Sequence, residues 1–411
     1  MNLYLFNAND SAATYGIGTY LKELTNALED AGINLHIIHL HSVCPEFEIV
    51  KTNHIENWYI PEVRNQRTFS GTIQKLEDYC RNVIYLLRLY IQDTKDLIFH
   101  FNYNQYQFLA RELKTVFECK TVAAVHFTKW ALAFHGNISL LHALKSKPEN
   151  QWNSFEKLIH TTHEYEGLIC KEVDRVITLS NYSQNLLCSE YQLNPDKVTV
   201  IPNGLKDTTQ LMKTKKKALK KRWHISDREF LILFAGRIHA VKGLLFLIKA
   251  FRKVLERVPY CRLMIAGNGE FDFYIKECEN IWTQVTWTGF IDKNKLYDLY
   301  SMADIGIMPS FHEQCSYVAI EMMMHGLPII GSTSTGLKEM IEDGETGLHI
   351  PVIEYEDRVE IDSSLLSEKM LYLLQHPSER ERMGINARKR YLKYYSLDIF
   401  RKNMLKFYQS F

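Results

Sequence analysis

Short apolar runs alternate with longer amphipathic stretches along most of this chain of 411 residues. This alternation predicts parallel α/β units, because each amphipathic helix carries the chain back to the same edge of a sheet. We expect strands at Leu3–Phe6, Ile33–Leu40, Leu97–Phe101, Thr121–His126, Arg175–Leu179, Val198–Ile201, Phe230–Phe234, Arg262–Ala266, Asp304–Met308 and 328–331. We expect helices at 20–31, 242–258, 316–325, 336–342 and 363–375 and from Ser396 onward, and helices with loops over 129–173.

The length exceeds that at which a single hydrophobic core stops growing, which favours two domains. The composition shifts at residues 213–222, which hold seven Lys or Arg and no acid. We therefore place the boundary near 205–228, with an N-terminal domain at 1–205 and a C-terminal domain at 206–395. The amphipathic helix at 396–411 is expected to pack back on the N-terminal domain. Because both halves repeat the alternation, the predicted fold is α/β with two Rossmann-like, doubly wound parallel sheets.

Charge and cysteine content exclude several classes of protein. The net charge of +1 gives no bias toward nucleic acid or another polyanion. None of the eight Cys forms a C-x-x-C pair, so neither a zinc site nor a redox pair is indicated, and the thiols suit a reducing compartment. The start lacks the pattern of a signal peptide, and no apolar run is long enough to span a membrane. We expect a cytoplasmic protein.

The basic run at 213–222 has two interpretations. It is favoured as the solvated face of a helix that enters the second domain. The alternative is a contact with anionic lipid at the inner face of a membrane, which would make the protein peripheral there.

Glu313 and Glu321 stand eight residues apart around a strand-to-helix junction. Glu313 follows the apolar run Asp304–Met308, and Glu321 lies about one turn inside the helix expected at 316–325. In an open α/β sheet, ligands bind at the carboxyl ends of the strands, and a helix start offers free N–H groups to anions. The pair is therefore a candidate binding site, although the helix dipole alone also favours a Glu in a first turn.

Two cations follow the strand expected at Phe230–Phe234. Arg237 offers a planar fork for phosphate oxygens, and Lys242, which is expected to open the next helix, offers a point charge. Two cations at one strand end suit a diphosphate better than a single carboxylate, although either could be a simple surface charge. Gly236, beside Arg237, favours a close approach of backbone to a ligand.

A Gly-x-Gly sequence, Gly267 to Gly269, follows the strand expected at Arg262–Ala266. It lacks the third glycine of a dinucleotide fingerprint, so NAD receives little support. It can still bring backbone near a nucleotide base.

The first half holds two further candidates at strand ends. Gly16 and Gly18 are expected in a loop before a helix, where their N–H groups can reach a phosphate or an acceptor. His126 ends a strand at the same sheet edge. A lone His at a strand end is more often structural, but its place opposite an anion-binding half favours a functional role.

With these residues the chain resembles the retaining glycosyltransferases of family 4, whose GT-B architecture sets two Rossmann-like domains facing a central cleft. The stretch Glu313–Met323 is also similar to that of a subgroup in Bacteroidetes-like bacteria. Five segments carry the resemblance: Gly16–Gly18, Asp174–Ser180, Lys197–Gly204, Gly236–Gly243 and Glu313–Gly326 with its Glu-x7-Glu spacing. They span most of the chain, and the last three together are specific.

The resemblance implies a role for each matching side chain. Glu313 would contact hydroxyls of the donor sugar, and Glu321 would hold the ribose of the nucleotide. Arg237 and Lys242 would bind the diphosphate and stabilise the leaving group, a task that other folds give to a metal. His126 would lie beside the anomeric carbon and steer the acceptor or the primary hydroxyl of the sugar.

The resemblance also implies binding roles for backbone N–H groups. The N–H groups of Cys315, Ser316, Tyr317 and Val318 would bind sugar and phosphate at the helix start. The family usually has a Gly-Phe-Gly-like loop where this chain has Gln314–Ser316, which puts the loop shape and the donor preference in question. A smaller departure is Leu205–Lys206, where an acidic residue is common.

The implied function is transfer of a sugar from a nucleoside-diphosphate donor to a glycan, lipid-linked or small-molecule acceptor, as in bacterial polysaccharide biosynthesis. The departing phosphate would act as the base in a same-face attack that keeps the anomeric configuration, so no protein nucleophile is expected. We also expect no cofactor, no metal and no nucleic acid partner. Two alternatives stay open: an epimerase or hydrolase of the same fold, which needs acid/base carboxylates from both domains, and a non-catalytic nucleotide-sugar-binding subunit. The sequence leaves the base, the sugar and the acceptor open.

Overall fold

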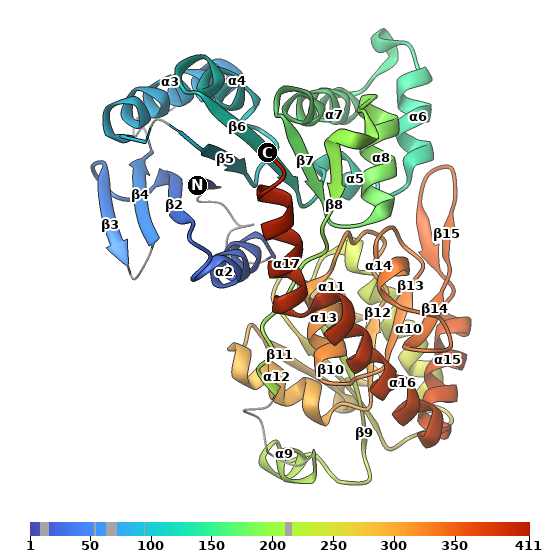
Figure 1. Ribbon diagram of the computed structural model, residues 1–411. Helices are drawn as coiled ribbons and strands as arrows, with labels where there is room; N and C mark the ends of the chain where they lie inside the picture. The colour runs from blue at the N-terminus through green and yellow to red at the C-terminus, as the bar shows by residue number, and fades with distance from the viewer. Residues whose placement is uncertain (9–15, 53–54, 63–71, 94, 210–215) are drawn as a thin grey trace. The chain divides into compact units, whose positions relative to one another are not determined.

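The computed structural model describes residues 1–8, 16–52, 55–62, 72–93, 95–209 and 216–411. The chain divides into two compact units (Figure 1). The first consists of Met1–Trp130, Pro148–Pro202 and Arg401–Phe411, and the second of Ala131–Lys147 and Asn203–Phe400.

The first unit is built on an eight-stranded sheet in the order β3-β4-β2-β1-β5-β6-β7-β8. All neighbouring strands are parallel except β3 and β4, which form an antiparallel edge. The strands are β1 (Asn2–Ala8), β2 (Asn34–Ser42), β3 (Glu48–Thr52), β4 (Ile55–Pro61), β5 (Leu97–Phe101), β6 (Cys119–Val125), β7 (Arg175–Thr178) and β8 (Val198–Val200).

The second unit holds a six-stranded parallel sheet in the order β11-β10-β9-β12-β13-β14 and a small antiparallel pair, β15-β16. The strands are β9 (Phe230–Ala235), β10 (Cys261–Ala266), β11 (Val285–Gly289), β12 (Ile305–Met308), β13 (Ile329–Ser332), β14 (Gly347–Ile350), β15 (Val352–Glu354) and β16 (Val359–Ile361).

Helices connect the strands. Those before residue 203 are α2 (Gly16–Leu28), α3 (Thr72–Tyr90), α4 (Gln107–Val116), α5 (Lys129–Ala133), α6 (Ile138–Ser146), α7 (Ser154–Glu172) and α8 (Asn181–Tyr191). Those after it are α9 (Lys216–Arg222), α10 (Leu244–Leu255), α11 (Asp272–Lys276), α12 (Lys293–Met302), α13 (Tyr317–Met324), α14 (Leu337–Met340), α15 (Ser363–Gln375), α16 (Pro377–Arg390) and α17 (Leu397–Tyr408). None of the helices that the structure describes has the length and apolar character that a membrane span needs.

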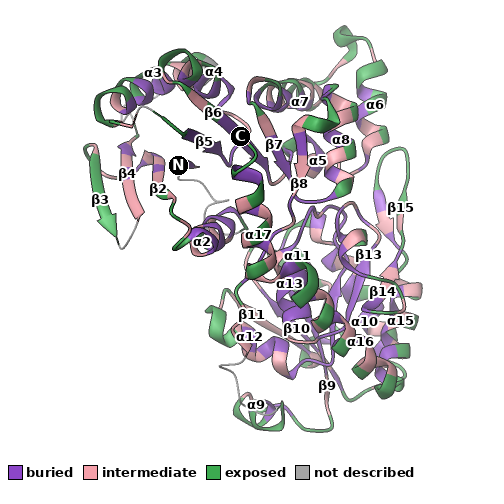
Figure 2. Cartoon of the chain, viewed as in Figure 1, coloured by how far each residue is buried: buried purple, intermediate pink, exposed green. Residues whose placement is uncertain are grey.

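Apolar strands form the centre of each unit, and Figure 2 shows them largely buried while the outer sides of many helices are exposed. Every residue of β5 and β12 is buried, and so is every residue of β9 after Phe230. A strand that is buried on both faces is typical of a parallel sheet covered by helices on either side. The end of α17 joins the first unit, where the hydroxyl of Tyr408 lies 2.7 Å from Nδ1 of the buried His100.

In each sheet the strand order changes direction at one place, because successive strands are added first on one side of a central strand and then on the other. In the first sheet the order runs outward from β1 to β2 and then resumes on the other side of β1 with β5. In the second, β10 and β12 lie on either side of β9. Ligands of open α/β sheets bind beyond the carboxyl ends of the strands at such a switch point. The loops after β9 and β12 therefore frame the expected binding edge of the second unit.

Two sequence-based expectations need correction. Gly16 and Gly18 lie in the first turn of α2 rather than in a loop before it, and the rest of the predicted loop, residues 9–15, is outside the described residues. Lys242 does not open a helix but ends a short 3-10 turn, Ala240–Lys242, and α10 begins only at Leu244. Gly243 separates the two. It lies in the left-handed region at φ +65°, and a Cβ there would lie 2.0 Å from the carbonyl oxygen of Pro309, so both the conformation and the space require a glycine.

The described part of the basic run forms α9, whose cations pack against acceptors of the second unit. Lys216 Nζ lies 2.8 Å from Oδ1 of the buried Asp304, and Lys220 Nζ donates to the carbonyl of Glu229 at 2.6 Å. Arg222 pairs with Asp298. These contacts favour the interpretation of α9 as a helix of the domain surface.

Candidate functional site

An ion pair joins the two loops that frame the switch point of the second sheet. Lys242 Nζ, after β9, lies 2.5 Å from Glu313 Oε1, after β12. The Lys242 side chain is 20% exposed and that of Glu313 is 12% exposed, so both charges are largely withdrawn from water. A charge-assisted contact of this kind fixes both side chains at the carboxyl edge of the sheet.

The backbone of Glu313 is held by the loop after β13. Its N–H donates to Oγ1 of Thr335 at 2.9 Å, and its carbonyl accepts from the Thr335 hydroxyl at 2.5 Å and from the Gly336 N–H at 2.7 Å. Thr335 adopts φ +32°, an unusual value for a residue with a branched Cβ. The cost of this conformation is offset by hydrogen bonds that orient Glu313.

Arg237 is exposed beside the same edge, with His239 two residues further on. The pKa of His239 is lowered by partial burial and by the positive charges of Arg237 and Lys242, while Glu270 opposes the shift. The Nδ1 atom of His239 accepts from the Val241 N–H at 3.3 Å, which stabilises the turn that carries Lys242. Arg237 and Lys242 thus place two positive charges at this edge, and that of Lys242 is paired with Glu313.

Gly236 and Gly267 bring the ends of β9 and β10 into direct backbone contact. A Cβ on Gly267 would lie 1.8 Å from the carbonyl oxygen of Gly236, and the Gly236 N–H donates to the Ala266 carbonyl at 2.9 Å. The close approach explains Gly267, whereas Gly236 has open space around a Cβ and is explained by its backbone conformation, φ +136°. The two glycines predicted as binding residues thus have a structural reason as well.

The start of α13 lies immediately after Glu313. Ser316 occupies the N-cap position, but its side chain makes no capping hydrogen bond, and its N–H contacts Sδ of Met340 at 3.3 Å. The Cys315 carbonyl accepts from Asn203 Nδ2 at 2.7 Å, and burial raises the pKa of the Cys315 thiol to about 12. Cys315 is therefore a protonated, packed thiol. The amides of Tyr317 and Val318 stand at the beginning of the helix, where N–H groups lack an i−4 partner within the helix.

Glu321 is buried inside α13 and both of its carboxylate oxygens are engaged. Oε2 accepts from the Tyr300 hydroxyl at 2.9 Å, and Oε1 lies 2.9 Å from Lys293 Nζ. Burial and the adjacent carboxylate raise the pKa of Tyr300, so its hydroxyl stays a donor. A carboxylate can accept about four hydrogen bonds, so Glu321 retains capacity for further donors.

His312 is a residue of the site that the sequence interpretation passed over. Burial lowers the pKa of its imidazole to about 4, and neither ring nitrogen has a hydrogen-bond partner among the described residues. The aromatic ring of Phe311 stacks with that of His135, at 5.7 Å between centroids, so the segment Ala131–Lys147 packs against this loop.

The remaining candidates lie in the first unit. His126 follows β6, and its Nε2 lies 3.1 Å from Asn102 Oδ1. Its ring packs edge-on against Tyr20 with 4.5 Å between centroids. Burial lowers the pKa of His126 to about 3, so the imidazole is neutral at physiological pH. Gly16 is exposed and Gly18 is partly exposed in α2.

The structure thus brings Arg237, Lys242, Glu313 and the start of α13 together in the second unit, whereas Gly16, Gly18 and His126 belong to the first. Thr335, Lys293, Tyr300 and His312 were missed. Of these four residues, only Thr335 lies in a segment with a sequence signal, the strand-end loop 332–336, which is rich in Ser and Thr.

Two family models match the two halves of the chain. Residues 14–208 match the family described as Glycosyltransferase Family 4, and residues 215–390 match the one described as Glycosyl transferases group 1. Each half of the chain therefore matches a family of glycosyltransferases, and the two-sheet fold is GT-B.

Solved structures share this GT-B fold over the whole chain. A sucrose-phosphate synthase from Thermosynechococcus elongatus aligns with a TM-score of 0.77 at 20% identity, covering 100% of this chain and 98% of that one. The Anabaena protein HepE in complex with UDP aligns with a TM-score of 0.70 at 14% identity, covering 100% of both chains. Identities this low show the fold alone.

Curated relatives of the GT-B chain match over shorter regions. An uncharacterized glycosyltransferase of Methanocaldococcus jannaschii is 34% identical over 194 residues, which are 46% of this chain and 50% of that protein. The α-D-kanosaminyltransferase of Streptomyces kanamyceticus is 28% identical over 41% of this chain and 42% of its own length. The chain spans about half the length of the curated relatives it matches.

Proposed function

We propose that this protein transfers a sugar from a nucleoside-diphosphate donor to an acceptor with retention of the anomeric configuration. The observation that carries the proposal is the Lys242–Glu313 pair at the switch point of the second sheet, with Arg237 on the same edge. We also propose that the enzyme falls in a subgroup of these glycosyltransferases from Bacteroidetes-like bacteria, because the segment Glu313–Met323 resembles theirs.

The charges of the edge suit the leaving group. In the proposed mechanism Arg237 binds diphosphate oxygens bidentately, and Lys242 adds a point charge where negative charge develops. N–H groups at the start of α13 donate to the sugar and the phosphate. These fixed cations and dipoles supply the stabilisation that a divalent metal supplies elsewhere, so we propose that transfer is independent of metal.

The carboxylates suit binding better than proton transfer. Glu313 is paired with Lys242, and Glu321 with Tyr300 and Lys293. In the proposed step the bond between the anomeric carbon and the phosphate oxygen breaks, and the acceptor oxygen bonds to the same face of that carbon. The acceptor proton passes to the departing phosphate. Glu313 holds sugar hydroxyls and Glu321 holds the ribose.

His126 would act as a neutral hydrogen-bonding group. Its lowered pKa makes an imidazolium costly, and its Nε2 already faces Asn102. Nδ1 is left to orient the acceptor or the primary hydroxyl of the donor sugar.

Two competing functions make different demands. An epimerase or hydrolase needs carboxylates that are able to exchange protons with the sugar, whereas Glu313 and Glu321 are both engaged by cations. A non-catalytic binding subunit needs the nucleotide contacts but no side chain directed to the sugar. The Thr335 hydrogen bonds that orient Glu313 therefore favour the transferase.

Thermal unfolding with UDP, GDP, ADP or NAD, each without added metal, tests the donor site. A ligand at a hundred times its Kd adds about 2.7 kcal/mol to the unfolding free energy. One nucleoside diphosphate should stabilise the wild type and Lys276→Ala, an exposed control on α11, but not Lys242→Ala. Stabilisation by NAD alone, or by none of the four, would refute the proposal. Once the donor is known, NMR of the product's anomeric proton decides retention, and turnover in EDTA decides metal dependence.

A further inference from the structure

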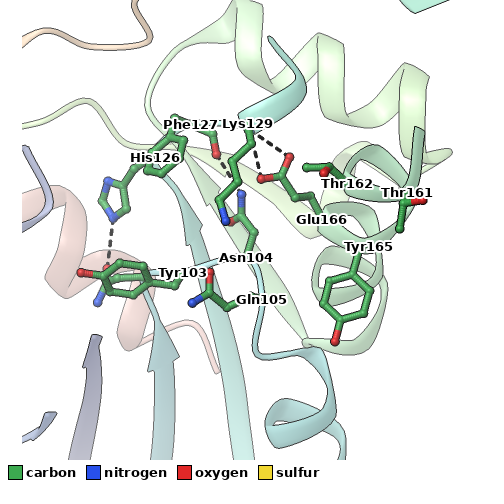
Figure 3. A pocket seen from close by; sticks show the side chains of 11 residues that line it. Tyr103, Asn104, Gln105, His126, Phe127, Lys129, Thr161, Thr162, Tyr165 and Glu166 are labelled. Atoms are coloured by element: carbon green, nitrogen blue, oxygen red, sulfur yellow. Dashed lines mark hydrogen bonds between the residues drawn. The ribbon is translucent and has the colours of Figure 1, made fainter. Parts of the chain in front are cut away.

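Two histidines follow β6 along the chain, but they lie in different units. His126 lines a pocket of the first unit together with Lys129 (Figure 3). His135 lies in the turn between α5 and α6, and this turn belongs to the second unit. The first half of the chain thus contributes a histidine to the unit that carries the Lys242–Glu313 pair.

The turn that carries His135 packs against the loop after β12. The ring of His135 stacks on that of Phe311, with 5.7 Å between their centroids. A Cβ on Gly136 would lie 2.9 Å from the Phe311 carbonyl oxygen, so the turn approaches this closely because a glycine stands there. On the other side of the turn, Asn137 Nδ2 donates to the Tyr355 carbonyl at 3.2 Å. The turn therefore lies directly on the loop that leads to Glu313.

The loop after β9 approaches His135 as well. Burial lowers the pKa of His135, and the charge of His239, in that loop, lowers it further. An effect of one imidazole on another requires the two groups to lie near each other. His135 is therefore close to both loops of the edge, the one with Arg237 and Lys242 and the one with Glu313.

His135 adopts a backbone conformation that is unfavourable for a residue with a Cβ. Its φ is +51°, in the left-handed region. The N–H groups of His135 and Gly136 donate to the carbonyls of Leu132 at 3.2 Å and Ala131 at 2.7 Å, and these bonds hold the turn in this shape. A glycine would satisfy the same turn without strain. The presence of a histidine here therefore points to a role for its side chain.

The charged side chains of the edge offer little net positive charge to a diphosphate. Lys242 is paired with Glu313 at 2.5 Å. Arg237 and Glu270 act on His239 in opposite directions. A nucleoside diphosphate carries about two to three negative charges near neutral pH, because its terminal phosphate has a second pKa of about 6. A further cation at this edge would therefore strengthen binding.

His312 and His239 are poor candidates for that cation, whereas His135 suits the role. Burial lowers the pKa of His312 to about 4. Nδ1 of His239 accepts from the Val241 N–H at 3.3 Å, so a proton on this nitrogen would break the turn. The ring nitrogens of His135 have no hydrogen-bond partner among the described residues. Its ring lies on the face of Phe311, whose π-system favours an imidazolium.

We propose that His135 is a further ligand of the diphosphate and that it binds the leaving group as an imidazolium, after taking up a proton from solvent. The inference rests on the proposed transferase function, which supplies the diphosphate. Negative charge beside an imidazole favours its protonated form, so nucleotide binding and protonation of His135 strengthen each other. Because the lowered pKa keeps His135 neutral at pH 7 in the free protein, binding should be accompanied by proton uptake.

Calorimetric titration of the full chain with UDP, GDP and ADP at pH 6 and pH 8 tests the proposal. His135→Asn and His135→Gly cannot titrate, and both residues tolerate the left-handed region, so the turn is kept. For the nucleotide that binds the wild type, each variant should bind about tenfold more weakly at pH 6 and about twofold more weakly at pH 8. His142→Asn changes an exposed histidine of α6 in the same segment and should match the wild type at both pH values.

Titration at pH 7 in buffers of different ionisation enthalpy counts the protons. The wild type and His142→Asn should take up more protons per nucleotide than His135→Asn does. The proposal is overturned if His135→Asn and His135→Gly bind like the wild type at pH 6, if the affinity ratio is the same at both pH values, or if proton uptake is equal. Absence of nucleotide binding in the wild type would overturn the transferase function as well, whereas unchanged binding in both variants overturns the role of His135 alone.

Discussion

Lys242 Nζ lies 2.5 Å from Glu313 Oε1, although 71 positions separate the two residues in the sequence. The contact exists because β9 and β12 are neighbours at the switch point of the second sheet, so the loops that follow them leave from the same edge. Each charge neutralises the other in a poorly solvated place, where an unpaired charge is costly. In the proposed transferase the pair would keep a cation in position for the diphosphate and a carboxylate in position for sugar hydroxyls.

Thr335→Ala should lower kcat about tenfold while the affinity for the nucleoside diphosphate stays unchanged. Loss of the hydroxyl removes both side-chain contacts to the Glu313 backbone, and about 1.4 kcal/mol of lost orientation corresponds to that factor. The measurement is turnover of the donor together with nucleotide titration. Thr335→Ser keeps the Oγ atom and should restore most of the rate; equal loss in both variants would show that the hydroxyl does not act through Glu313.

Gly243→Ala should destabilise the second unit by about 2–4 kcal/mol and weaken nucleotide binding. The new Cβ would approach the Pro309 oxygen and push apart the loops that carry Lys242 and Glu313. Gly344→Ala is the matched control, since Gly344 also has a positive φ, +75°, but open space around it. That change should cost about 1 kcal/mol, from the left-handed conformation alone, and should spare nucleotide binding. Urea unfolding of both variants measures the difference, and equal costs would contradict the predicted contact.

The Glu166 carboxyl should make stability depend on pH. Burial raises its pKa from 4.5 to about 7 in the folded state, despite the opposing hydrogen bonds from Lys129. Between those values the folded state keeps a proton that the unfolded state has lost, so stability falls as pH rises from about 4.5 to about 7. The loss is on the order of 3 kcal/mol. Glu166→Gln cannot titrate, so the wild type should lose stability relative to it over this range in urea unfolding. A difference between the two that is constant with pH would contradict the assignment.

The strand-end motifs of the second unit were predictable because their signals are local. Apolar runs followed by Gly236-Arg237 or Pro309-Ser310 mark buried strands that end in loops, and neighbouring parallel strands bring such loops together. Glu313, Lys242 and Arg237 were therefore expected at one edge. The residues that hold the two carboxylates were not predictable in the same way. Thr335 contacts Glu313, and Tyr300 and Lys293 contact Glu321, but all three lie at distant positions and carry no pattern that indicates their partners.

The first unit was predicted less completely for a physical reason. All residues of β3 are exposed, so this edge strand lacks the alternation that marks a half-buried strand. Helix α7 buries the polar residues His163 and Glu166 together with Gly167, which interrupts its apolar period. Helix α7 thus lies in the stretch, 129–173, whose apolar pattern is the least regular.

The most direct test of the account is calorimetric titration of Lys242→Ala and Glu313→Ala with the nucleoside diphosphate that stabilises the wild type, alongside turnover of the corresponding nucleotide sugar. We predict that Lys242→Ala loses nucleotide affinity, whereas Glu313→Ala binds the nucleotide as the wild type does and loses turnover. Lys276→Ala should match the wild type in both. Wild-type binding and turnover in Lys242→Ala would contradict the diphosphate site, and equal loss of nucleotide affinity in Glu313→Ala would contradict its contact with the donor sugar.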